Sequence, residues 1–113
     1  MDIYHIWANK NGDASDKEWV SNIRTFLDSL VLDGRMSSYR ITRCKLGLRS
    51  ISDLPEWHIM MEFEDLAHLD RAFSEVARLT GDLEEKHKSF NVFVSDDIQH
   101  ALYRDWPDVT RGT

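Results

Sequence analysis

The chain has 113 residues, of which 42% are hydrophobic and 30% are charged. This length allows one hydrophobic core but not two, and this balance is that of a globular protein, which argues against a disordered chain. The formal net charge of −6 repels phosphate backbones and anionic headgroups, so we expect neither nucleic acid nor a membrane surface as a partner.

Two further features bear on the cellular compartment. Cys44 is the single cysteine, so an internal disulfide and a cysteine-based metal cage are both excluded. The first residues lack the basic region and apolar run of a secretory signal, and no stretch reaches the length of a membrane span. We therefore expect a cytoplasmic protein.

The first third of the chain predicts a strand followed by a helix. Residues 2–8 are apolar, aromatic or β-branched and are followed by turn formers at 9–13, a pattern typical of a strand and its loop. Ser15 and Glu18 match a capping box. Apolar residues then recur at helical spacing: Trp19, Val20, Ile23, Phe26, Leu27, Leu30 and Val31. The helix is predicted to end at Asp33 and Gly34, where glycine suits the left-handed closing position.

Residues 38–46 and 56–63 predict a pair of strands. The second run alternates clearly, with Trp57, Ile59, Met61 and Phe63 on one side. The connection at 47–55 is too long for a tight hairpin and carries three aliphatic residues that we expect to be exposed.

The last part of the chain predicts a second helix and a fourth strand. Asp65 is placed to cap this helix, Gly81 to end it, and its buried stripe is predicted to comprise Leu66, Leu69, Ala72, Phe73, Val76 and Leu79. Residues 83–94 keep a helical interval and predict either a third helix or an extension of the second. A last strand is predicted at 98–104. We expect one domain over residues 1–106 and a polar tail over 107–113.

This order of elements predicts an α+β fold of ferredoxin-like type, βαββαβ. Two right-handed strand-helix-strand units place the first and third strands in the middle of a four-stranded antiparallel sheet, with both helices on one face. His58, Met60 and Glu62 then point away from the helices. Four tryptophans, three tyrosines and five phenylalanines exceed what two helices can cover. We therefore expect a homodimer that pairs through this second sheet face.

Three segments carry a resemblance to a known superfamily. The opening at 2–7, the strand-to-helix passage at 57–66 and the ending at 101–107 resemble the dimeric α+β barrel superfamily. That superfamily includes antibiotic-biosynthesis-type monooxygenases, stress-responsive small proteins and many uncharacterised bacterial proteins. The resemblance spans residues 2–106 and implies this fold and a homodimer. Some members bind haem through a histidine, but no histidine of this chain matches that ligand.

Three histidines on neighbouring predicted strands form the first candidate site. His5, His58 and His100 lie on the first, third and fourth strands, and Glu62 follows His58 on the same side. On one face, these groups would supply ligands for zinc, iron or copper, or a base with its orienting partner. The alternative is that each histidine is hydrogen-bonded in the barrel wall or dimer seam, and we assign no metal.

Two further clusters offer binding chemistry. A basic concentration is formed by Arg40, Arg43 and Lys45, with Arg49 just after them. It suits a ligand carboxylate or phosphate, or else a solvated sheet edge that discourages aggregation. An aromatic set is suited to line a pocket for a planar organic molecule between sheet and helices, or else to pack in the core: Tyr4, Trp7, Tyr39, Trp57 and Tyr103.

The chain lacks a Gly-rich phosphate loop, a nucleophile elbow and a paired-cysteine motif, which argues against nucleotide-dependent transfer and serine or cysteine hydrolysis. RNA-recognition domains share the element order, but the basic-glycine-aromatic start of their motif is missing. We predict a small organic ligand bound at the sheet without a cofactor. The pocket candidates are His5, His58, His100, Glu62, Arg43, Tyr4, Trp7 and Tyr103. The alternative is a cofactor-independent or haem- or metal-assisted monooxygenase-like enzyme.

Overall fold

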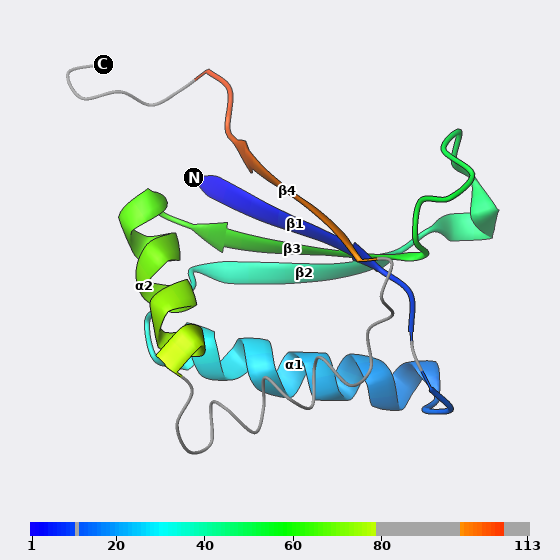
Figure 1. Cartoon of the computed structure of the whole chain (residues 1–113), viewed down its shortest axis with the longest axis horizontal. Helices are drawn as coiled ribbons and strands as arrows, with labels where there is room; N and C mark the ends of the chain where they lie inside the picture. The colour runs from blue at the N-terminus through cyan, green and yellow to red at the C-terminus, as the bar shows by residue number, and fades with distance from the viewer. Residues whose placement is uncertain (11, 79–97, 108–113) are drawn as a thin grey trace.

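The computed structural model describes residues 1–10, 12–78 and 98–107. Its elements follow the predicted order: β1 (Asp2–Ala8), α1 (Asp16–Leu32), β2 (Ser38–Arg43), the short 3₁₀ helix η1 (Lys45–Gly47), β3 (Trp57–Phe63), α2 (Leu66–Arg78) and β4 (Gln99–Arg104) (Figure 1). Within these described ranges, no helix combines the length and apolarity needed to cross a bilayer. The cytoplasmic location and the domain boundary at residue 106 stay predictions.

The four strands form one antiparallel sheet in the order β2-β3-β1-β4. The first and third strands therefore lie in the middle, as predicted. In the register, His5 lies opposite Met60 on β3 and opposite Ala101 on β4. Because paired residues point to the same side of a sheet, this register decides which side chains share a face.

One face of the sheet is covered by both helices and holds the core (Figure 1). Trp19 of α1 packs against Trp57 of β3 with ring centroids 4.8 Å apart, and Phe73 of α2 meets Tyr4 of β1 edge to face at 5.1 Å. The predicted alternation of β3 is confirmed, because its helix-facing side chains are all buried: Trp57, Ile59, Met61 and Phe63. The predicted stripe of α1 is buried or packs against this core.

Both helices begin, and α1 also ends, where capping chemistry predicts. The Ser15 hydroxyl accepts a hydrogen bond from the Glu18 backbone N–H at 3.1 Å, and the Asp65 carboxylate accepts one from the His68 backbone N–H at 2.8 Å. Gly34 follows α1 with a φ of +73°. These contacts satisfy N–H groups that the first turn of a helix leaves without a partner.

The second strand is shorter than predicted. It ends at Arg43. The Cys44 backbone N–H still donates to the Glu56 carbonyl, but the chain then turns into η1, where Leu46 adopts a left-handed φ of 57°. The β2–β3 connection extends past the end of the sheet (Figure 1). Its exposed aliphatic side chains are confirmed for Leu48 and Ile51, and Leu54 is half-buried.

The predicted stripe of α2 is partly wrong. Ala72 is buried, but Leu66 is 60% exposed, because it is the first residue of a helix that starts beyond the end of β3 (Figure 1). Phe73 is also exposed, at 41%, although its ring contacts Tyr4. The predictions for the Val76 side chain, Leu79, Gly81, residues 83–94 and the tail from 108 lie outside the described residues.

His68 is a buried polar residue that the sequence did not single out. Its Nδ1 accepts a hydrogen bond from the Glu64 backbone N–H at 3.1 Å, and its Nε2–H donates to the Gly34 carbonyl at 2.9 Å. A carbonyl can only accept, so these two bonds determine the tautomer. The imidazole thus ties the turn after α1 to the start of α2.

We predict that His68→Leu lowers the free energy of unfolding by about 1–3 kcal/mol, because it removes both hydrogen bonds between the buried imidazole and the backbone. Urea denaturation at one protein concentration measures this change. Ser74→Leu, at an exposed position of the same helix, is the matched control and leaves stability near the wild-type value. Equal stability of His68→Leu and wild type would contradict the structural role of His68.

Candidate functional site

The sheet face turned away from the helices, here named the open face, is made of alternate residues of the four strands. Its members follow from the register: Ile3, His5, Trp7, Ser38, Arg40, Thr42, His58, Met60, Glu62, Gln99, Ala101 and Tyr103. The middle of this face is apolar and aromatic. Its charged groups, Arg40 and Glu62, come from β2 and β3.

His5 and His58 are hydrogen-bonded to each other at the centre of the open face. The His5 Nδ1 and His58 Nε2 atoms are 2.8 Å apart, and the ring planes differ by 17°. His58 lies opposite Trp7 in the register, so it is the diagonal neighbour of His5, a position that long and aromatic side chains reach across a sheet. With centroids 5.0 Å apart, the two imidazoles meet edge to edge as one flat surface.

Two aromatic side chains support this pair. Trp7 is nearly parallel to both imidazoles, with its ring centroid 4.6 Å from His58 and 5.6 Å from His5. Tyr103 of β4 meets His5 edge to face at 4.8 Å. We name these four residues, His5, His58, Trp7 and Tyr103, the imidazole cluster. These residues come from β1, β3 and β4, which are neighbours in the sheet.

The surroundings of the imidazole pair favour its neutral form. Partial burial lowers the pKa of His5. The pKa of His58 is lowered by two causes, first by partial burial and then by the nearby charge of protonated His5. Their mutual hydrogen bond has the same effect, because one ring must donate an N–H while the other offers a bare nitrogen. A pair with both rings fully protonated has no acceptor and loses this bond.

His100 does not join the other two histidines. It lies opposite Ile6 in the register, so it points to the helix side, where it stacks on Tyr4 at 5.7 Å. The hypothesis that three imidazoles meet on one face is therefore wrong. Among the described residues, no group of three or more His, Cys, Asp and Glu side chains is arranged to hold a metal ion.

The predicted aromatic pocket is likewise divided between the two faces. Tyr4, Tyr39 and Trp57 lie on the helix side, whereas Trp7 and Tyr103 lie on the open face. A single pocket lined by all five is therefore wrong, because a strand sends successive side chains to opposite faces. Glu62 lies on the open face as predicted and accepts a hydrogen bond from the Ser38 hydroxyl.

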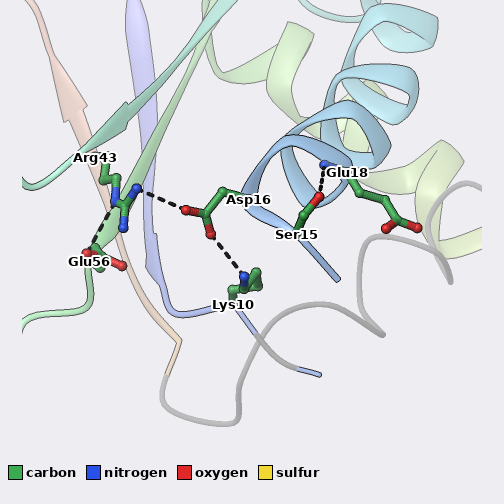
Figure 2. A network of polar contacts seen from close by, with 6 residues as sticks. All are labelled: Lys10, Ser15, Asp16, Glu18, Arg43 and Glu56. Carbon is green, nitrogen blue, oxygen red and sulfur yellow. Dashed lines mark hydrogen bonds and ion pairs between the residues drawn. The ribbon is translucent and has the colours of Figure 1, made fainter. Parts of the chain in front are cut away.

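Arg43 belongs to an ion-pair network at the other side of the sheet (Figure 2). Its guanidinium contacts the Asp16 carboxylate at 3.0 Å and the Glu56 carboxylate at 3.3 Å, and it lies over the Trp57 ring. Lys10 contacts Asp16 at 3.0 Å, and this contact is the largest cause that lowers the pKa of Asp16. The charge of Arg43 is thus shared between two carboxylates of its own chain.

The basic concentration predicted around Arg43 is dispersed. Arg40 points to the open face, Arg43 to the helix side, and Lys45 lies beyond the strand. Two open hollows border the Arg43 network. One of about 490 Å³ is lined by Arg43, Cys44, Lys45, Leu46, Gly47 and Glu56. The other, of about 540 Å³, is lined by Asp16, Lys17, Val20, Ser21, Arg24 and Trp57. His5, His58 and His100 line neither hollow.

Comparison with protein families gives one match over the whole chain. The model of DUF6614, described as a family of unknown function, matches residues 1–113. The chain belongs to this family. No curated protein matches the DUF6614 chain.

Solved structures with the same fold extend this result. The Arabidopsis thaliana protein At3g17210 has a TM-score of 0.72 and 13% identity, over 97% of this chain and 99% of its own. A dimeric ferredoxin-like protein of unknown function from Jannaschia sp. CCS1 has a TM-score of 0.65 and 13% identity, over 93% of this chain and 100% of its own. SnoaB, a cofactor-independent oxygenase from Streptomyces nogalater, has a TM-score of 0.58 and 13% identity, over 95% of this chain and 97% of its own. These likenesses confirm the predicted ferredoxin-like fold and its resemblance to dimeric proteins.

We predict that the DUF6614 chain loses stability as the pH falls below about 6.5, the ordinary pKa of histidine. The folded protein holds the pKa of His5 and of His58 below this value, so the unfolded chain binds more protons as the pH falls. Urea denaturation between pH 8 and pH 5 measures the effect at fixed protein concentration.

The double variant His5→Gln/His58→Gln should lose less stability than wild type over the same pH range. His100→Gln, which changes an imidazole on the opposite face, should follow wild type. An unchanged pH dependence in the double variant would show that this pair does not contribute to acid sensitivity.

Proposed function

We propose that the DUF6614 chain is a homodimer whose two open faces pack against each other and hold a small planar organic molecule at the imidazole cluster. The observation that carries this proposal is the open face itself. Its centre bears Trp7 and a neutral, hydrogen-bonded imidazole pair, yet no described helix covers it. Apolar and aromatic groups in this arrangement typically mark an interface or a ligand site.

Several features support pairing through this face. Tyr103 is 58% exposed, and the side chains of Ile3 and Met60 are only half-buried. The charged groups Arg40 and Glu62 come from the β2 side, which matches an interface with an apolar middle and a polar rim. Three solved structures with the same fold are described as dimeric.

The chemistry of the cluster suggests the kind of ligand. Flat aromatic surfaces such as the Trp7 ring and the imidazole pair favour a planar partner, which stacks on them at little entropic cost. The imidazole pair offers both a donor and an acceptor to polar groups of that ligand. Among the described residues, Arg40 is the one Lys or Arg side chain on the open face, and it favours a ligand that carries a carboxylate.

We predict that wild type sediments as a dimer and that Met60→Glu shifts it to a monomer, because the substitution puts a charge in the middle of the seam. Sedimentation velocity at several concentrations measures the state. Ser74→Glu adds the same charge on the exposed side of α2 and remains dimeric. Wild type that stays monomeric at high concentration would rule out the dimer.

We also predict that 2-naphthoate, a planar aromatic carboxylate, raises the melting temperature of wild type as the ligand concentration increases. Trp7→Ala should abolish this shift, because it removes the stacking surface. Trp106→Ala is the matched control, since Trp106 is 88% exposed and lies outside the cluster. An equal shift in wild type and Trp7→Ala would place the ligand elsewhere on the molecule.

A cofactor-independent oxygenase is the second candidate function. The similarity to SnoaB favours it, because that protein is described as such an enzyme, and the imidazole pair adds a base able to deprotonate an acidic aromatic substrate. Anthrone is a suitable probe, since anthrone and O₂ give anthraquinone and water. Metal-free wild type should consume O₂ faster than His58→Gln. Equal consumption in both proteins would exclude this activity at the pair.

A further inference from the structure

The hydrogen bond between His5 and His58 brings two ring nitrogens toward one point. His5 Nδ1 and His58 Nε2 are 2.8 Å apart, and in the neutral pair a single proton lies between them. Neutral imidazole is the commonest metal ligand in proteins, and the surroundings of this pair favour the neutral form. When each ring carries its proton on the outer nitrogen, both inner nitrogens offer a lone pair to the same space. A cation bound there takes the place of the shared proton.

A thioether side chain lies beside this pair. Met60 of β3 is the direct cross-strand neighbour of His5 on the open face, and it follows His58 on the same side of β3. Side chains at such paired positions have Cβ atoms about 4.5–5.5 Å apart. A methionine side chain is unbranched and flexible, so its sulfur is able to turn toward the imidazoles. Among the described residues, no third His, Cys, Asp or Glu side chain completes a metal site with the pair.

We infer that His5, His58 and Met60 form a binding site for Cu(I). Thioether sulfur is a soft ligand that selects Cu(I), and imidazole also suits copper, whereas magnesium, calcium and manganese prefer oxygen ligands. At a metal–nitrogen distance of about 2.0–2.1 Å, as for zinc, the two inner nitrogens separate by about 1 Å to admit the ion. All three ligands come from one chain, so the inference goes beyond the proposed function and needs neither the dimer nor the organic ligand.

The Trp7 ring adds an electrostatic attraction at this site. It is nearly parallel to both imidazoles, and its centroid lies 4.6 Å from that of His58 and 5.6 Å from that of His5. An ion between the two imidazoles therefore lies within the roughly 6 Å over which an aromatic ring attracts a cation, and tryptophan is the best of the aromatic residues in this role.

The charges around the site favour a monovalent ion over a divalent one. The three ligands are uncharged, so they neutralise none of the charge of the ion, and the cost of desolvating an unpaired charge rises with its size. Arg40 is the direct neighbour of Met60 on β2, and it is exposed, so water and salt screen its charge. Glu62 follows Met60 on the same face of β3, where it accepts a hydrogen bond from the Ser38 hydroxyl.

The test is an anaerobic titration of Cu(I) in competition with bicinchoninate, whose copper complex is followed by its absorbance. All proteins carry Cys44→Ser, because a free thiol is also a ligand for Cu(I). This chain should bind one Cu(I). Adding His58→Gln or Met60→Leu should lower the affinity by at least about 10-fold. Met61→Leu and His100→Gln make the same changes on the helix side and should keep the affinity.

Three outcomes would overturn the copper site. A chain that takes no Cu(I) from bicinchoninate lacks the site, and an affinity that neither variant lowers places the ion elsewhere. A loss with His58→Gln but not with Met60→Leu removes the thioether and with it the preference for Cu(I). Met60→Leu conserves the volume of the side chain and should fold, so the test does not depend on the histidine variant. Sedimentation of the same proteins reports on the dimer separately, so a missing dimer overturns the proposed function alone.

Discussion

The antiparallel register between β1 and β3 determines the character of both faces of the sheet. Pairing His5 with Met60 puts Tyr4, Ile6 and Ala8 over the helices and leaves His5 and Trp7 on the other side. A shift of one residue would exchange these sets, burying imidazoles in the core and exposing its apolar residues. The packing of Trp57 against Trp19 and the burial of Phe63 oppose such a shift, so the core stabilises the arrangement of the open face.

The two polar clusters of the described structure have different physical roles. Arg43, Asp16 and Glu56 bring together opposite charges that are about half exposed, and ion pairs of this kind contribute little to stability individually. They join the start of α1 to neighbouring ends of β2 and β3, which suits an architectural role (Figure 2). His5 and His58 are instead two titratable groups that bind each other in the neutral state. A binding or catalytic site uses groups of this second kind.

His68 is a histidine with a structural role in this chain. Both of its ring nitrogens are engaged by backbone groups, so the ring is buried with its polar atoms satisfied and has no nitrogen left for a ligand. The outer nitrogens of the His5–His58 pair lie on a face that no described helix covers. Residue type alone does not separate these two situations, because the difference lies in which partners the backbone brings within reach.

The sequence by itself determined the order of the elements, the caps of both helices at Ser15 and Asp65, and the alternation of β3, because these depend on neighbours in the chain. It also indicated the ferredoxin-like fold. Only the tertiary structure decided that His58 joins His5 while His100 stacks on Tyr4, and that Arg43 is bound by two carboxylates. Those outcomes depend on the phase of one strand against another, and side chains alternate with a period of two, so a one-residue uncertainty reverses them.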